Sequence, residues 1–100
     1  MEFQYGSLRL IDADDCQLTE RHDFTLEREQ EYAFGYVLKG DIELVLVADG
    51  HPQRQIIESR QLFLIPEKSR IVICPRGPYP ARLVFIRFQW EGDGSLFFPQ

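Results

Sequence analysis

Residues 34–50, FGYVLKGDIELVLVADG, contain the pattern that decides the fold. Two apolar runs rich in β-branched and aromatic side chains flank Lys39-Gly40-Asp41, which indicates a strand, a turn and a second strand. Asp49-Gly50 follows the second run, and both residue types tolerate the positive φ angles of a tight turn. We therefore expect residues 34–50 to form a hairpin that ends in a second tight turn.

Short apolar runs of the same kind recur along the chain, and turn-forming residues separate them. The further expected strands are residues 5–11, 16–19, 24–27, 53–57, 61–65, 70–74 and 81–90. Residues 12–15 and 20–23 are polar and are expected to be loops. Apolar residues nowhere repeat with a sustained helical period. The pattern predicts one all-β domain over residues 1–100, a sandwich or barrel with little or no helix.

The longest expected strand, residues 81–90, carries apolar side chains on both faces. Leu83 and Phe85 lie on one face, and the other face carries Val84, Ile86 and Phe88. A strand with two apolar faces belongs to a two-layer structure, or to a barrel wall with a partner outside it.

Composition and charge limit the functions that this chain can have. Hydrophobic residues make up 44% of its 100 residues, which suits a packed core. The net charge of −5 weighs against binding to a nucleic-acid backbone, which needs clustered Lys and Arg. Residues 1–10 lack the basic and apolar regions of a signal peptide, so we expect none there, and no apolar run approaches the roughly 20 residues of a membrane helix. We expect a cytoplasmic protein outside the membrane, with Cys16 and Cys74 as free thiols.

Several blocks of sequence, in order and at matching spacing, carry a resemblance to a known family. They are YVLKG at residues 36–40, Asp49-Gly50, LFLIP at residues 62–66, Pro75, and LVFIRF at residues 83–88. In this order the chain resembles, over about residues 24–90, the N-terminal sensor domain of AraC-type transcription regulators. The resemblance implies a cupin-like jelly-roll barrel. It departs at two turns, where cupins carry Gly-Asp and Pro-Gly and this chain has Arg60-Gln61 and Glu67-Lys68.

The resemblance also implies where a metal would bind in a metal-dependent cupin. The ligand positions fall on or near Glu27, Glu29, Ala33 and Ile71. Ala and Ile cannot ligate a metal, and two carboxylates without imidazole are a poor site for Fe, Mn or Zn. We therefore expect no metal and no cofactor, as is typical of AraC-type sensor domains.

Sensor domains of this type bind their effector inside the barrel, so the resemblance implies a set of ligand-binding residues. They are Thr25, Glu27, Glu29, Ile73, Leu83, Phe85 and Arg87. The acids and Arg87 would hydrogen-bond a polyol such as a sugar, or a charged metabolite, and Phe85 would stack on a sugar face. Ala33 and Gly35 are small and would leave room inside. Glu27 and Glu29 also fit a solvated face, and Ile73, Leu83 and Phe85 also fit a simple core.

Three functions follow from these observations. The first is a non-catalytic, effector-sensing and dimerising domain of an AraC-type regulator, which would reach DNA only through a C-terminal domain outside this chain. The second is a stand-alone, metal-independent cupin enzyme of the sugar isomerase or epimerase type, with Tyr32 or Tyr36 as acid or base. The third is an interaction module that exposes an apolar patch of Trp90, Phe97 and Phe98.

Overall fold

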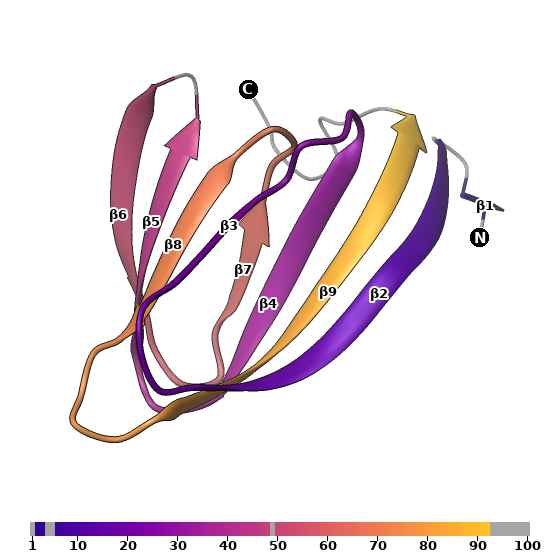
Figure 1. Ribbon diagram of the computed structural model, residues 1–100. Coiled ribbons are helices and arrows are strands. Elements are labelled where there is room, and N and C mark those ends of the chain that lie inside the picture. Colours follow the sequence, from indigo (N-terminus) through magenta and orange to yellow (C-terminus); the bar gives the residue numbers. More distant parts are fainter. Residues whose placement is uncertain (1, 4–5, 49, 93–100) are drawn as a thin grey trace.

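Nine β-strands make up the computed structural model, which describes residues 2–3, 6–48 and 50–92 (Figure 1). The strands are β1 (Glu2–Phe3), β2 (Gly6–Leu18), β3 (His22–Thr25), β4 (Glu31–Lys39), β5 (Ile42–Ala48), β6 (His51–Ile57), β7 (Leu62–Ile65), β8 (Arg70–Pro75) and β9 (Ala81–Gly92). The all-β prediction is confirmed. A search of the described residues for a helix long and apolar enough to cross a membrane finds none.

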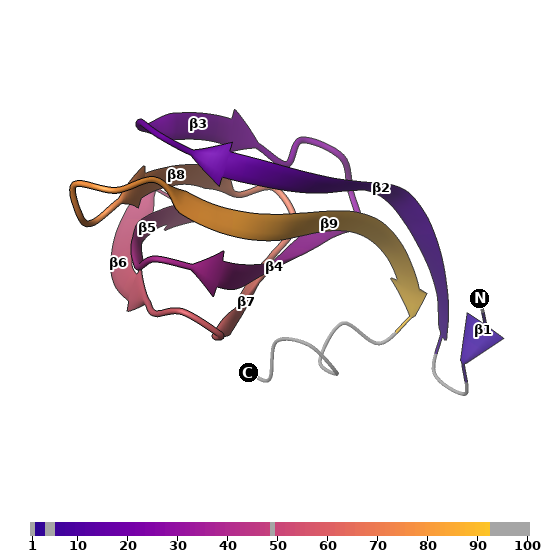
Figure 2. The same cartoon turned by 90° about the horizontal axis from the view of Figure 1, so that it is seen from below.

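The strands form two antiparallel sheets that face each other. One sheet has the order β1-β2-β9-β4-β7, and the other has the order β3-β8-β5-β6. Figure 1 shows the two sheets meeting at one end of the molecule and spreading apart toward the other, and Figure 2 shows β9 lying between β2 and β4. This arrangement is the jelly-roll barrel that the resemblance implies.

The prediction of a hairpin over residues 34–50 is wrong, because β4 and β5 lie in different sheets. The chain crosses between the sheets at Gly40, whose φ is 81° and which lies against β9. A Cβ atom at Gly40 would make a tight 3.2 Å contact with the Ala81 Cα, and the positive φ disfavours any residue with a side chain at this position. The second tight turn is confirmed between β5 and β6, where Gly50 has a φ of 75°. Asp49 lies outside the described residues.

The prediction that residues 12–15 form a loop is also wrong. Strand β2 is continuous and pairs with β9 from Gly6 to Leu18, with one irregularity at Ile11. Asp12 and Asp15 bond to Arg87 and Arg82 on β9, so long-range pairing overrides the local preference of Asp for turns. The loop expected over residues 20–23 is shorter, because β3 begins at His22, and β3 ends at Thr25 instead of Glu27.

The main core fills the space between the two sheets. Leu26, Val37, Ile42, Ile65 and Ile71 in this core are fully buried. The expectation that Gly35 leaves room inside the barrel is wrong, because the Phe63 ring occupies that space. A Cβ atom at Gly35 would lie 2.2 Å from the Phe63 Cζ atom.

A second, smaller cluster lies on the outer face of the sheet that contains β9. Tyr32, Phe88 and Trp90 are buried there, and Leu8 and Phe34 pack against them. The two apolar faces predicted for β9 are therefore confirmed. The exposed patch predicted around Trp90 is not, because Trp90 is 2% exposed. Phe97 and Phe98 lie outside the described residues.

Two turns adopt left-handed backbone conformations with side chains that do not favour them. Arg60 has a φ of 69° and Lys68 has a φ of 57°. These are the two positions at which the resemblance shows that cupins carry Gly. The Arg60 amide donates a 2.6 Å hydrogen bond to the Val37 carbonyl, which ties the turn to β4 and holds the backbone in this strained conformation.

Replacing Arg60 with Gly is expected to stabilise the domain by about 0.5–1 kcal/mol, because the left-handed strain is larger than the entropy cost of Gly. Urea unfolding followed by circular dichroism measures the change. Arg60→Ala is the control, since it removes the same side chain and keeps the strain. Equal stability of the two variants would contradict this account of the turn.

Candidate functional site

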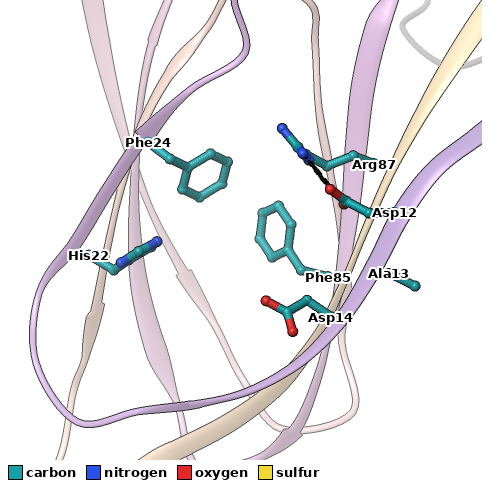
Figure 3. A pocket seen from close by; sticks show the side chains of 7 residues that line it. All are labelled: Asp12, Ala13, Asp14, His22, Phe24, Phe85 and Arg87. Carbon is teal, nitrogen blue, oxygen red and sulfur yellow. Dashed lines mark hydrogen bonds and ion pairs between the residues drawn. The ribbon is translucent and has the colours of Figure 1, made fainter.

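A cavity of about 460 Å³ opens where β2 and β9 of one sheet face β3 of the other. Seven residues line it: Asp12, Ala13, Asp14, His22, Phe24, Phe85 and Arg87 (Figure 3). We call this cavity the Arg87 pocket. Its volume is within the range of small-molecule sites. The side chains converge because the inward residues of β2 and β9 face those of β3.

Aromatic rings form the inner wall of the Arg87 pocket. The rings of Phe24 and Phe85 meet edge to face, with centroids 4.9 Å apart and an interplanar angle of 86°. The ring centroids of Phe63 and Phe85 are 5.9 Å apart, and those of His22 and Phe24 are 5.8 Å apart. Edge-to-face contact is the favoured geometry for aromatic pairs, so these rings hold one another in place. The pocket therefore has a rigid apolar wall joined to the core.

Arg87 forms the charged wall of the pocket, and two carboxylates hold its guanidinium. Its Nε donates to both carboxylate oxygens of Asp12, at 3.0 Å and 3.1 Å, and its Nη2 donates to Asp12 Oδ2. Its Nη1 donates to Glu31 Oε1 at 3.3 Å. The sheet register explains the arrangement, because Arg87 is paired with Asp12 on β2 and with Ala33 on β4, two residues after Glu31.

The two carboxylates differ in their surroundings. The Glu31 side chain is 5% exposed, whereas the Asp12 side chain is 46% exposed. The hydrogen bonds from Arg87 lower the pKa of Asp12, and the same bonds raise the pKa of Arg87. Arg87 therefore stays charged and partly neutralises a buried acid that would otherwise be costly.

A second cavity of about 240 Å³ also includes the Arg87 side chain. Its lining residues are Ile11, Thr25, Glu27, Arg28, Glu31 and Arg87. Arg87 therefore lines both cavities.

The structure brings four of the predicted ligand-binding residues to these cavities. Phe85 and Arg87 line the Arg87 pocket, and Thr25, Glu27 and Arg87 line the second cavity. The binding role of all seven predicted residues stays a prediction.

The other three predicted residues lie elsewhere. Glu29 is exposed and pairs with Lys68 at 3.3 Å. Ile73 and Leu83 are buried in the main core, at 2% and 1% exposure.

Sequence reasoning missed Asp12, Asp14, His22 and Phe24 as lining residues. The sequence predicts a loop over residues 12–15, which contains the two acids, and another over residues 20–23, which contains the histidine. Their spacing holds a usable signal, because Asp12 and Asp14 are two residues apart and so share one face of any strand.

The positions at which a metal-dependent cupin binds its metal do not fit a metal here. Ala33 and Ile71 are fully buried apolar residues, and Glu27 and Glu29 are exposed. Among residues 2–3, 6–48 and 50–92, no three His, Cys, Asp or Glu side chains come together as metal ligands.

Neither tyrosine that was considered as an acid or base lines the cavities. Tyr32 stacks on Phe88 in the outer cluster, with ring centroids 5.9 Å apart. Tyr36 alternates with the inward residues Gly35 and Val37 and so lies on the same outer face.

Solved structures with the same architecture are cupin domains. The Drosophila melanogaster CENP-C cupin domain matches with a TM-score of 0.64 and 13% identity, over 75% of this chain and 54% of that one. The Clostridium difficile EutQ protein matches with a TM-score of 0.59 and 23% identity, over 81% and 57%. Hydroxypropylphosphonic acid epoxidase from S. wedmorenis, in complex with fosfomycin, matches with a TM-score of 0.64 and 13% identity, over 78% and 43%.

These likenesses establish that the chain has a cupin fold. The chain spans about half the length of these three proteins. No protein-family model matches the sequence, and no curated protein matches it. One of the similar structures is an enzyme and another is CENP-C bound to CAL1, so the fold by itself is compatible with catalysis and with protein binding.

Replacing Arg87 with Met is expected to destabilise the domain by about 2 kcal/mol, because it leaves the buried Glu31 carboxylate without its charged partner. Urea unfolding at neutral pH measures the loss. Arg82→Met is the matched control. Arg82 also lies on β9 and pairs with an Asp of β2, at 2.8 Å, but both partners are exposed. We expect little change in the control, and equal losses in the two variants would contradict the special role of Glu31.

Proposed function

We propose that this domain is the non-catalytic, effector-binding domain of an AraC-type transcription regulator, and that its effector binds in the Arg87 pocket. The observation that carries the proposal is the pocket itself, a half-open cavity with a rigid aromatic wall and a fixed guanidinium. Small-molecule sites commonly combine apolar walls with a few oriented polar groups.

The position of the pocket supports a sensing role. It lies between β2 and β3, which belong to opposite sheets and are joined by only a short connection. A ligand that contacts both strands favours the spacing of the sheets that fits it, and so shifts the population of domain conformations. In an AraC-type regulator that shift would be passed to a DNA-binding domain outside this chain.

The non-catalytic part of the proposal rests on the kinds of groups that line the cavities. Asp12, Glu31 and Arg87 satisfy one another, which suits a fixed binding surface more than proton transfer. The resemblance to metal-free sensor domains points the same way.

NMR titration of the chain with sugars, amines, amino acids and organic acids tests the proposal. We expect one class to shift the amides of His22, Phe24, Phe85 and Arg87 in a saturable way. Phe85→Leu should weaken that binding severalfold, since it removes the ring that faces the ligand. Phe34→Leu on the outer face is the control and should leave the affinity unchanged. Saturable shifts confined to other surfaces would contradict the site.

A second candidate function, self-association through the outer face of the same sheet, is favoured by two exposed leucines. Leu10 on β2 is 59% exposed and Leu62 on β7 is 58% exposed, although both belong to the face that carries the smaller apolar cluster. Exposed apolar side chains around such a cluster are typical of protein interfaces. A dimerising sensor would use both functions.

Sedimentation of the Leu10→Glu, Leu62→Glu double variant tests this candidate. We expect the wild-type chain to form dimers at rising concentration and the double variant to stay monomeric, because charges oppose burial of the face. Ile56→Glu is the control, since Ile56 is 46% exposed but lies on β6 in the other sheet. A wild-type chain that stays monomeric throughout would rule the candidate out.

A further inference from the structure

The charges of the Arg87 pocket restrict the class of ligand that it can hold. Asp12, Asp14 and Arg87 are its carboxylate and guanidinium groups, so one negative charge is in excess. Arg87 is already held by Asp12 and Glu31. An anionic ligand would have to displace one of these acids and would be repelled by Asp14. The pocket is therefore poorly suited to carboxylates and phosphates.

Asp14 is the acid of the pocket that remains available. It forms no ion pair and no side-chain hydrogen bond with the described residues. Figure 3 shows its carboxylate pointing into the pocket below Phe85, with the His22 ring directed inward from the opposite wall. A positively charged group between them would gain an ion pair with Asp14.

The negative charge of Asp14 acts within the domain. Cys16 lies two residues further along β2, and burial raises the pKa of its thiol. Asp14 and Asp15 raise that pKa further. The negative charge of Asp14, which disfavours the thiolate form of Cys16, would also favour a positively charged group in the Arg87 pocket.

The aromatic wall of the Arg87 pocket also suits a ligand with a positively charged group. Phe85 presents its ring next to the carboxylate of Asp14, and the Phe24 ring lies against Phe85 further along the same wall. An ammonium group is attracted to the face of an aromatic ring, and the apolar part of the ligand gains contact with the same rings. A free carboxylate next to phenylalanine rings is a pattern that recognises an organic cation.

We propose that the Arg87 pocket binds an organic amine that has an apolar or aromatic body, with its ammonium group on Asp14 and its body against Phe24 and Phe85. This inference rests on the proposed effector-binding function and narrows the class of effector. Arg87 and Asp12 would then shape the pocket without contacting a ligand charge.

Three probes that share one ring and differ in charge test the proposal: benzylamine, benzyl alcohol and benzoate. Their dissociation constants are measured with the full chain by NMR titration at neutral pH, from the shifts of the amides of residues 14, 24 and 85. We expect benzylamine to bind more tightly than benzyl alcohol by about threefold to fivefold, the size of one ion pair at a half-open site. Benzoate should bind more weakly than both.

A pair of isosteric variants separates charge from shape. Asp14→Asn should reduce the affinity for benzylamine to that for benzyl alcohol and leave the affinity for benzyl alcohol unchanged. Asp15→Asn is the matched control, because Asp15 is the next residue on β2, points to the other face and pairs with Arg82. It should leave both affinities unchanged, and circular dichroism checks that both variants fold.

The outcomes distinguish this inference from the function on which it rests. Benzoate or benzyl alcohol binding as tightly as benzylamine would overturn the amine proposal while keeping a ligand in the pocket. An Asp14→Asn variant with unchanged preference for the amine would also overturn it. If all three probes fail to shift pocket amides, the amine proposal fails, and the broader metabolite titration then decides separately whether the pocket binds an effector.

Discussion

The pairing of β2 with β9 is the constraint on which the rest of the structure depends. It joins the two ends of the described chain and places Asp12 beside Arg87, 75 positions away in sequence. It also makes β9 an inner strand with neighbours on both sides, β2 and β4. Because β9 is held on both edges, its inward side chains Phe85 and Arg87 have fixed positions in the pocket. The ion pairs then follow from the register and not from local sequence.

The sheet alternation gives the domain two distinct surfaces from the same strands. Inward residues of β9 build the core and the Arg87 pocket, whereas outward residues build the cluster around Phe88. Ligand binding inside the barrel and association through its outer face are therefore compatible. A shift of β9 would move side chains both in the Arg87 pocket and in the cluster around Phe88. A sensing domain that reports to a partner needs such a connection between ligand and interface.

The fold class could be predicted from sequence because apolar runs and turn residues are local signals. The expected strands near residues 61–65, 70–74 and 81–90 agree closely with β7, β8 and β9. The connections between strands could not be predicted in the same way. The sequence around Gly40 is compatible both with a turn that closes a hairpin and with a turn that crosses between sheets. Asp12 and Asp14 were missed because partners on β9, distant in sequence, decide that this acidic run is extended. The aromatic half of the pocket could be predicted in part, through Phe85, but Phe24 joins it only through the facing of the two sheets.

The register that joins Gly6 to Gly92 also has a consequence for how the chain is made. Strand β2 leaves the ribosome before its partner β9, the last strand described, so one edge of β2 stays unpaired until β9 has been made. The open edge of β4 is in the same position, because β9 fills the place between them. Unpaired strand edges in unfinished chains tend to associate with one another. The acids at residues 12, 14 and 15 place negative charge on β2. In two unfinished chains these like charges oppose the association of the unpaired β2 edges before β9 has been made.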